Sequence, residues 1–226
     1  MNYILKNLKK LKEAINFACN SVNRSADEIQ ILPITKGVDI EKIKFLYDNG
    51  FKEFGENRVK EAYEKIIYLP KNIKWHLVGH LQSNKVKKAL EIFKVIQSID
   101  RFEIIDEIDK RGIDVEVFLE FNCSQEEQKH GFKVEEWEKA VENILNSKHL
   151  KLIGFMTLGP YPVDEIRSRK AFEKLRIIRD KAIEKFNLKN LKLSMGMSED
   201  FIYAIMEGAD IIRIGRAIFE ENFNFK

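Results

Sequence analysis

The sequence predicts an α/β protein built as a (β/α)8 barrel with one extra N-terminal helix. Short apolar segments of strand length alternate with amphipathic segments of helical length, which is typical of a parallel sheet covered by helices. Eight strand segments can be counted, the number that closes a parallel barrel. The first strand is followed by Lys-Gly-Val-Asp, without the GxGxxG pattern of an open dinucleotide-binding sheet.

The first 25 residues are predicted to form the extra helix. Apolar residues recur at intervals of three or four, which places them on one helical face: Ile4, Leu8, Leu11, Ile15, Ala18 and Val22. Because Glu13 is present and arginine is missing from the first twenty residues, the segment does not fit a transit peptide. We expect a structural helix that packs against the core.

The barrel is expected over residues 30–219. Its predicted strands are 31–36, 53–56, 74–79, 95–99, 115–122, 152–158, 192–196 and 211–215. Its predicted helices are 40–49, 58–67, 84–92, 101–110, 135–146, 164–186 and 199–207. Residues that favour helix starts precede or open six of them, namely Asp39, Asn57, Ser83, Asp100, Asp164 and Ser198.

Composition and charge narrow the function classes. The 226 residues are 44% hydrophobic and 33% charged, as expected for one folded domain over residues 1–226. A net charge of +3 is too small to indicate nucleic-acid binding. The longest uncharged apolar run, residues 152–163, contains two prolines and is too short to cross a bilayer. We therefore expect binding to neither nucleic acid nor membrane. Cys19 and Cys123 lack the CxxC spacing of metal or redox sites, and no secretory segment is evident, so we expect a cytoplasmic protein.

The loops after the seventh and eighth strands carry a candidate phosphate site. Ser198 follows the glycine-containing turn SMGMS at the start of a helix, where a hydroxyl and free backbone N–H groups attract anions. Gly215, in RIGR, lets a ligand approach the backbone. Either feature alone is more simply an ordinary capped helix or glycine turn. Together they predict phosphate binding, because such barrels bind phosphate with these two loops.

Lys36 ends the first predicted strand, in the segment QILPITKG. A closed barrel pairs its first strand with its last, so Lys36 would lie beside Arg213 and Gly215. Burial in an apolar mouth and repulsion by the arginine would both disfavour the protonated amine. A neutral amine near a phosphate site is what a Schiff base with a phosphorylated aldehyde requires. The alternative is a surface lysine whose stem packs against apolar groups.

Six segments between residues 31 and 219 form a larger pattern: ILPITKG, FGENRVKEA, WHLVGHLQSNKVKKAL, NCSQEEQKHGF, GFMTLG and LSMGMSEDFIYAIMEGADIIRIGRAIF. In this order they resemble the pyridoxal-phosphate homeostasis protein family, and the long C-terminal segment is the most specific. The resemblance implies a fold like the N-terminal barrel of alanine racemase. It also implies pyridoxal 5'-phosphate (PLP) as the cofactor.

The resemblance assigns roles to residues at matching positions. Lys36 matches the lysine that forms the internal aldimine with PLP. Ser198, Gly215 and the backbone of Arg216 match positions that hold the phosphate. Arg213 matches the arginine that faces the pyridine nitrogen in the related racemases. No metal site is implied.

Three further residues would line the pyridine ring and its substituents: Asn57, Met156 and Ser194. Three positions depart from the family pattern without touching the aldimine or the phosphate site: Gln97, where a histidine is usual, Lys60, which replaces a glutamine, and Glu220, which replaces a glycine. The segment CSQEEQKHG is expected to form a mobile loop over the rim, with Lys129 as a second amine near the cofactor.

The resemblance implies a monomeric PLP carrier that serves intracellular vitamin B6 homeostasis and releases PLP to apo-enzymes. Arg213 keeps its proton, so a pyridine nitrogen facing it stays unprotonated and the ring becomes a weaker electron sink. The alternative is a PLP-dependent amino-acid racemase, which needs a second acid–base group opposite the lysine. An aldolase with a Schiff-base lysine and no cofactor fits less well, because it has no need of the phosphate site together with Arg213.

The histidines do not indicate a metal. His76 and His80 are four residues apart, but they straddle a strand end and a glycine-containing loop, and no HExxH motif is present. We therefore expect no metal site.

Overall fold

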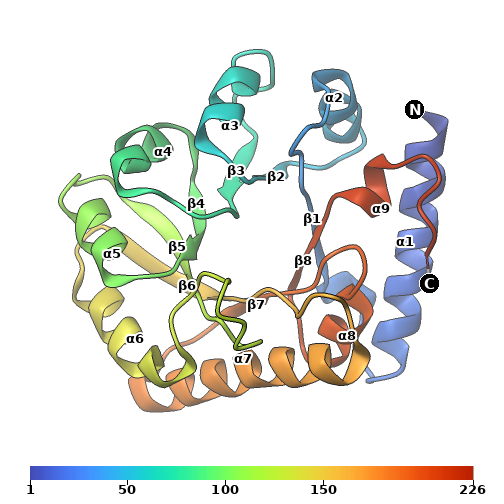
Figure 1. Ribbon diagram of the computed structural model, residues 1–226. Coiled ribbons are helices and arrows are strands. Elements are labelled where there is room, and N and C mark those ends of the chain that lie inside the picture. Colours follow the sequence, from blue (N-terminus) through green and yellow to red (C-terminus); the bar gives the residue numbers. More distant parts are fainter. Residues whose placement is uncertain (226) are drawn as a thin grey trace.

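The computed structural model describes residues 1–225 and has eight parallel strands in a nearly closed barrel (Figure 1). The strands are β1 (Gln30–Pro33), β2 (Glu53–Glu56), β3 (Lys74–Leu77), β4 (Val95–Ile99), β5 (Val115–Glu120), β6 (Leu150–Met156), β7 (Lys192–Ser194) and β8 (Ile211–Ile214). The helices are α1 (Asn2–Asn20), α2 (Ile40–Asp48), α3 (Val59–Ile66), α4 (Val86–Ile92), α5 (Phe102–Asp109), α6 (Trp137–Asn146), α7 (Glu165–Phe186), α8 (Phe201–Met206) and α9 (Arg216–Phe219). Short 3-10 turns are η1 (Ala26–Glu28), η2 (Ser83–Lys85) and η3 (Val134–Glu136).

Strand pairing confirms the predicted barrel. Each strand from β2 to β7 pairs in parallel with the next, and β8 also pairs with β1 so that Leu32 lies opposite Arg213. β1 and β2 are joined less extensively, by a single isolated bridge between Ile34 and Gly55. The first strand therefore lies beside the last, as predicted, and the C-terminal ends of all strands meet at one end of the barrel.

The strands end earlier than predicted at this end of the barrel. β1 stops at Pro33 and not at residue 36, because the chain turns at Gly37, whose φ is +67°. β5 stops at Glu120, because Phe121 and Asn122 pair instead with Phe132 of the following loop. Apolar residues continue past both strand ends, so the hydrophobic pattern alone extends the strands too far.

Helix starts were predicted with mixed success. Asp39 and Asp164 are N-cap residues as predicted, and the Asp164 side chain accepts a hydrogen bond from the N–H of Arg167. The other four assignments are wrong by one or two residues, since the N-caps of α3, α4, α5 and α8 are Arg58, Lys85, Arg101 and Asp200. The buried Asp100 serves an ion pair instead, and Ser198 receives a hydrogen bond from α9.

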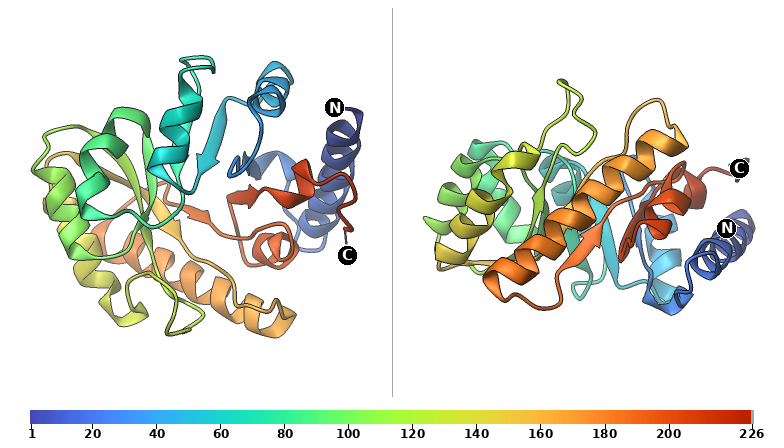
Figure 2. Two further views of the ribbon diagram at one scale, coloured as in Figure 1. Left: turned by 45° about the horizontal axis from the view of Figure 1, so that its top comes forward. Right: turned by 90° about the horizontal axis from the view of Figure 1, so that it is seen from below.

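The N-terminal helix packs against the end of the chain. α1 lies beside α8, α9 and the C-terminal segment, on the outside of the barrel (Figures 1 and 2). Its apolar face is buried, and the buried Asn7 amide donates to the carbonyls of Ile218 (3.1 Å) and Glu220 (2.8 Å). The helix ends at Asn20, earlier than the predicted residue 25, and η1 leads into β1.

A layer of apolar side chains fills the barrel beneath its C-terminal end. Leu32, Val95, Phe118, Met156 and Ile211 form this buried cluster. β6 carries Gly154 against the Phe118 ring, and a Cβ at position 154 would lie only 2.4 Å from Cε1 of that ring. The layer supports the cavity above it.

Among the described residues, no helix is long and apolar enough to cross a membrane.

Candidate functional site

A cavity of about 870 Å³ opens at the C-terminal ends of the strands. Six of the eight predicted site residues line it: Lys36, Asn57, Ser198, Arg213, Gly215 and Arg216. They come from the loops after β1, β2 and β7 and from β8 and its following loop. The topology therefore brings together residues that are up to 180 positions apart in the sequence.

The turn that carries Lys36 is fixed by helix α3. Gly37 donates its N–H to Oε1 of Glu61 at 2.5 Å. The Lys65 amine donates to the carbonyl of Thr35 at 2.6 Å and to Oε1 of Glu61 at 2.8 Å. Both neighbours of Lys36 are thus held in place, which fixes the point at which its side chain enters the cavity.

Lys36 itself is exposed, so the predicted burial of its side chain is wrong. The reason is the early end of β1, which places the lysine in a turn and not inside the barrel. Within residues 1–225, its Nζ has no hydrogen-bond acceptor and no carboxylate within 4.0 Å. The amine is therefore available to a ligand in the cavity.

The predicted phosphate site has a different construction from an ordinary helix cap. Helix α8 begins after Asp200, whose Oδ1 accepts a hydrogen bond from the N–H of Met197 at 2.6 Å. The hydroxyl of Ser198 accepts one from the N–H of Ala217 at 3.1 Å, which links the loops after β7 and β8.

Backbone N–H groups of these two loops remain free. In the described part of the chain, the N–H groups of two consecutive pairs of residues find no protein acceptor: Ser198 and Glu199, and Gly215 and Arg216. Unpaired N–H groups at the wall of a cavity are suited to bind an anion. The side chain of Arg216 pairs with Glu199 at 2.8 Å, at the rim of the same region.

Arg213 is buried, with 3% of its surface exposed, and its guanidinium lines the cavity. It donates to Oγ of Ser194 and to the carbonyl of Thr157, both at 2.8 Å. No carboxylate of residues 1–225 lies within 4.0 Å of it. Burial lowers the pKa of Arg213 to about 10, so the group still carries its charge at neutral pH.

Two predicted ring-lining residues do not reach the cavity. Met156 is fully buried in the apolar layer beneath it. Ser194 is fully buried behind Arg213, where its hydroxyl also bonds to Gln97 at 2.7 Å. Met156 therefore supports the cavity from beneath, and Ser194 supports the Arg213 guanidinium, instead of contacting a ligand directly.

Sequence analysis missed Glu120, a buried carboxyl on the cavity wall. The strand was expected to end at Asn122, so Glu120 was placed inside it. The side chain of Glu120 has no hydrogen-bonding partner among the described residues. Burial and, to a smaller extent, the charge of Asp100 raise the pKa of Glu120, Arg213 partly offsets both effects, and the resulting pKa is about 8. The sequence does contain a signal for this residue, because a carboxyl side chain at the end of an otherwise apolar strand is unusual.

Asp200 is a second buried carboxyl on the same wall. Burial raises the pKa of Asp200, while the hydrogen bond from Met197 and the charge of Arg213 lower it. Its Oδ2 is buried and has no partner within residues 1–225. The cavity is therefore lined by one buried cation, Arg213, and two buried carboxyl groups, those of Glu120 and Asp200.

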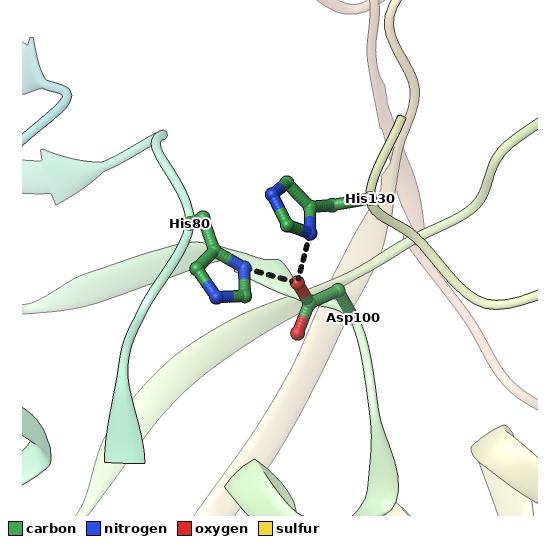
Figure 3. A group of neighbouring side chains, drawn as sticks. All are labelled: His80, Asp100 and His130. Carbon is green, nitrogen blue, oxygen red and sulfur yellow. Dashed lines mark hydrogen bonds and ion pairs between the residues drawn. The ribbon is translucent and has the colours of Figure 1, made fainter. Parts of the chain in front are cut away.

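His80, Asp100 and His130 meet at the cavity mouth (Figure 3). Nδ1 of His80 lies 2.6 Å and Nδ1 of His130 lies 3.8 Å from Oδ2 of Asp100, and the two rings stack with centroids 3.9 Å apart. Their ligand atoms lie within 4.8 Å of one another, so this set could hold a divalent metal. Asp100 also pairs with Arg101, and His130 contacts the pair through its ring stacking on His80 and its longer approach to Asp100.

That loop, residues 121–133, projects from the same end of the barrel as the segment before α7, as the right-hand view of Figure 2 shows. Lys129 lines the cavity, but its amine donates to the carbonyl of Gly159 at 2.5 Å and to Oγ of Ser124 at 3.2 Å, and it pairs with Glu126. The Lys129 amine thus joins the two projecting segments.

Comparisons with known proteins agree with this architecture. Residues 7–222 match the family model described as the alanine racemase N-terminal domain. The pyridoxal phosphate homeostasis protein of Aquifex aeolicus is 38% identical over 95% of this chain and 96% of its own. That of Haemophilus influenzae is 35% identical over 96% and 94%. The structure of PipY from Synechococcus elongatus with PLP bound has a TM-score of 0.77 at 27% identity, over 91% of this chain and 99% of PipY.

Proposed function

The chain belongs to the pyridoxal phosphate homeostasis protein family, and from this premise we propose that it binds PLP in the cavity and serves PLP homeostasis. One observation carries the proposal. A lysine amine, a buried guanidinium and a set of free backbone N–H groups meet at one cavity, and none of them has a carboxylate partner among the described side chains. An aldehyde, a pyridine nitrogen and a phosphate are the groups that would satisfy them.

The phosphate would bind to the free N–H groups of Ser198, Glu199, Gly215 and Arg216. A backbone approach at Gly215 is sterically open, since a Cβ at this position would lie no closer than 3.5 Å to any neighbouring atom. The Arg216 side chain pairs with Glu199 at 2.8 Å, so the backbone N–H groups are the free donors of this region. The residues present therefore fit the anionic end of the proposed ligand.

Lys36 would hold the ligand covalently. Its amine would form a carbon–nitrogen double bond with the aldehyde carbon, and the aldehyde oxygen would leave as one water molecule. Support comes from the free Nζ of Lys36 and from the rigid turn formed by Gly37, Glu61 and Lys65. Water can return to the exposed side chain and reverse the bond, as release of the cofactor requires.

Arg213 would face the pyridine nitrogen. Bound PLP supplies an electron-withdrawing ring, which stabilises a carbanion best when its nitrogen is protonated. A guanidinium donates a hydrogen bond without losing its proton, so Arg213 would keep that nitrogen unprotonated. The arrangement favours holding and releasing PLP over chemistry at the ring.

We further propose that the protein works as a monomer in the cytoplasm and releases PLP to apo-enzymes. Both cysteines, Cys19 and Cys123, are free and buried, which suits a reducing compartment. The exposed lysine at the cavity mouth suits transfer, because a receiving amine can reach the same carbon.

A titration of the apo-protein with PLP tests the proposal. Absorbance of the PLP chromophore is followed during the titration, and the same loaded sample is then incubated with L-alanine. We expect saturable binding with a spectral change and no racemisation. Turnover of alanine would support the alternative racemase function, and failure to bind PLP would refute the proposed function altogether.

A further inference from the structure

A continuous chain of hydrogen bonds crosses the barrel interior and ends on Arg213. Nε2 of His76 lies 2.8 Å from Oε2 of Glu53, and Nδ1 of His76 lies 2.9 Å from Nε2 of Gln97. Oε1 of Gln97 accepts a hydrogen bond from Oγ of Ser194 at 2.7 Å, and that hydroxyl accepts one from Arg213 at 2.8 Å. The chain joins β2, β3 and β4 to β7 and β8, and the bond between Gln97 and Ser194 links β4 to β7.

The donors and acceptors of this chain can be arranged in only one direction. The Glu53 carboxylate only accepts, because the hydrogen bond from His76 lowers the pKa of Glu53 to about 2. Nε2 of His76 therefore carries the hydrogen. Burial lowers the pKa of His76 and keeps the ring neutral, so its Nδ1 accepts. The Gln97 amide must then donate to His76, which turns its oxygen toward Ser194 and leaves the Ser194 oxygen free to accept from Arg213.

All links after Glu53 are buried: His76 is 2% exposed, Gln97 and Ser194 are 0% exposed, and Arg213 is 3% exposed. Broken hydrogen bonds in such a place are not replaced by water. Within residues 1–225, Arg213 has one other acceptor, the carbonyl of Thr157. Two anchors on its two terminal nitrogens fix the plane of the guanidinium, whereas one anchor would leave it free to rotate.

We propose that Gln97 is a positioning residue, which sets the orientation of the Arg213 guanidinium toward the ligand through Ser194. This inference rests on the proposed function, because it assumes that Arg213 meets the pyridine nitrogen of PLP. An imidazole at position 97 could accept from Ser194 on one nitrogen and donate to His76 on the other, so glutamine and histidine support the same chain.

The test compares Gln97→Leu with Gln97→His in the full chain, using PLP affinity and the absorbance spectrum of bound PLP. The spectrum reports the hydrogen bond at the ring nitrogen, which a merely structural residue would not affect. We expect Gln97→Leu to weaken PLP binding by about tenfold, the effect of losing one buried hydrogen bond, and to shift the spectrum. Gln97→His should keep the PLP affinity and the spectrum of the wild type.

Ser194→Ala provides a second route to the same result if Gln97→Leu fails to fold. It removes the direct acceptor of Arg213 and should produce the same spectral shift. The inference is overturned if a folded Gln97→Leu or Ser194→Ala variant binds PLP with wild-type affinity and spectrum, even if its melting temperature falls. Failure of the wild type to bind PLP would instead refute the proposed function, so the two failures are distinguishable.

Discussion

Replacement of Glu120 by glutamine should stabilise the apo-protein at alkaline pH and have little effect at acidic pH. In the folded protein Glu120 keeps its proton up to about pH 8, whereas in the unfolded chain it releases the proton near its ordinary value of 4.5. The unfolded state therefore binds fewer protons than the folded state between these values. The free energy of unfolding must fall as pH rises through this window and level off above it.

The size of the effect follows from the same two values. A pKa raised from 4.5 to about 8 corresponds to a loss of about 5 kcal/mol at full ionisation. Glutamine cannot ionise, so Glu120→Gln should recover up to that amount at about pH 9 and only about 1 kcal/mol at about pH 5.

Urea unfolding at these two pH values, followed by tryptophan fluorescence, measures the difference. Glu127→Gln is a matched control, because Glu127 lies in the following loop and is exposed. Its free energy of unfolding should follow the wild type at both values. An equal gain for Glu120→Gln at both pH values, or no gain at about pH 9, would refute the reasoning from burial.

Three further predictions concern packing. Gly154→Ala should cost about 1–3 kcal/mol in urea unfolding, because its Cβ would lie 2.2 Å from the carbonyl of Lys192; unchanged stability would contradict this. Asn7→Ala should lower the free energy of unfolding by about 1–3 kcal/mol, since two carbonyls of the C-terminal segment lose their donor, and calorimetry that finds no loss would argue against that anchor. Cys123 should resist iodoacetamide in the native state, because burial raises the pKa of its thiol to about 12; mass spectrometry should find labelling only after urea is added, and rapid native labelling would be the opposite result.

Periodicity and strand count were sufficient to predict the barrel, because every strand needs an apolar segment and every helix an amphipathic one. The ends of the elements were harder to predict. Ile34 and Phe121 are apolar residues just beyond the ends of β1 and β5, where regular strand pairing is reduced to isolated bridges while the side chains remain packed. Hydrophobic pattern reports packing and not backbone pairing, so it placed Lys36 inside a strand.

The candidate site was predictable where it depends on strand order and not where it depends on long-range contacts. Pairing of β1 with β8 brings Lys36, Arg213 and Gly215 to one cavity, as expected from a closed barrel. The bond from Gln97 to Ser194 joins residues 97 positions apart, and no local pattern announces it. His130 meets His80 only because a loop folds back over the mouth, which spacing cannot reveal.

The most direct test of the account is to find the lysine that carries PLP. PLP-loaded protein is reduced with borohydride, digested and mapped by mass spectrometry, with Lys36→Ala and Lys42→Ala as a matched pair. Lys42 also lines the cavity, but its amine pairs with Asp39 at 3.1 Å. We predict the adduct on the Lys36 peptide in the wild type and in Lys42→Ala, and none in Lys36→Ala. An adduct on another lysine of the wild type would contradict the account.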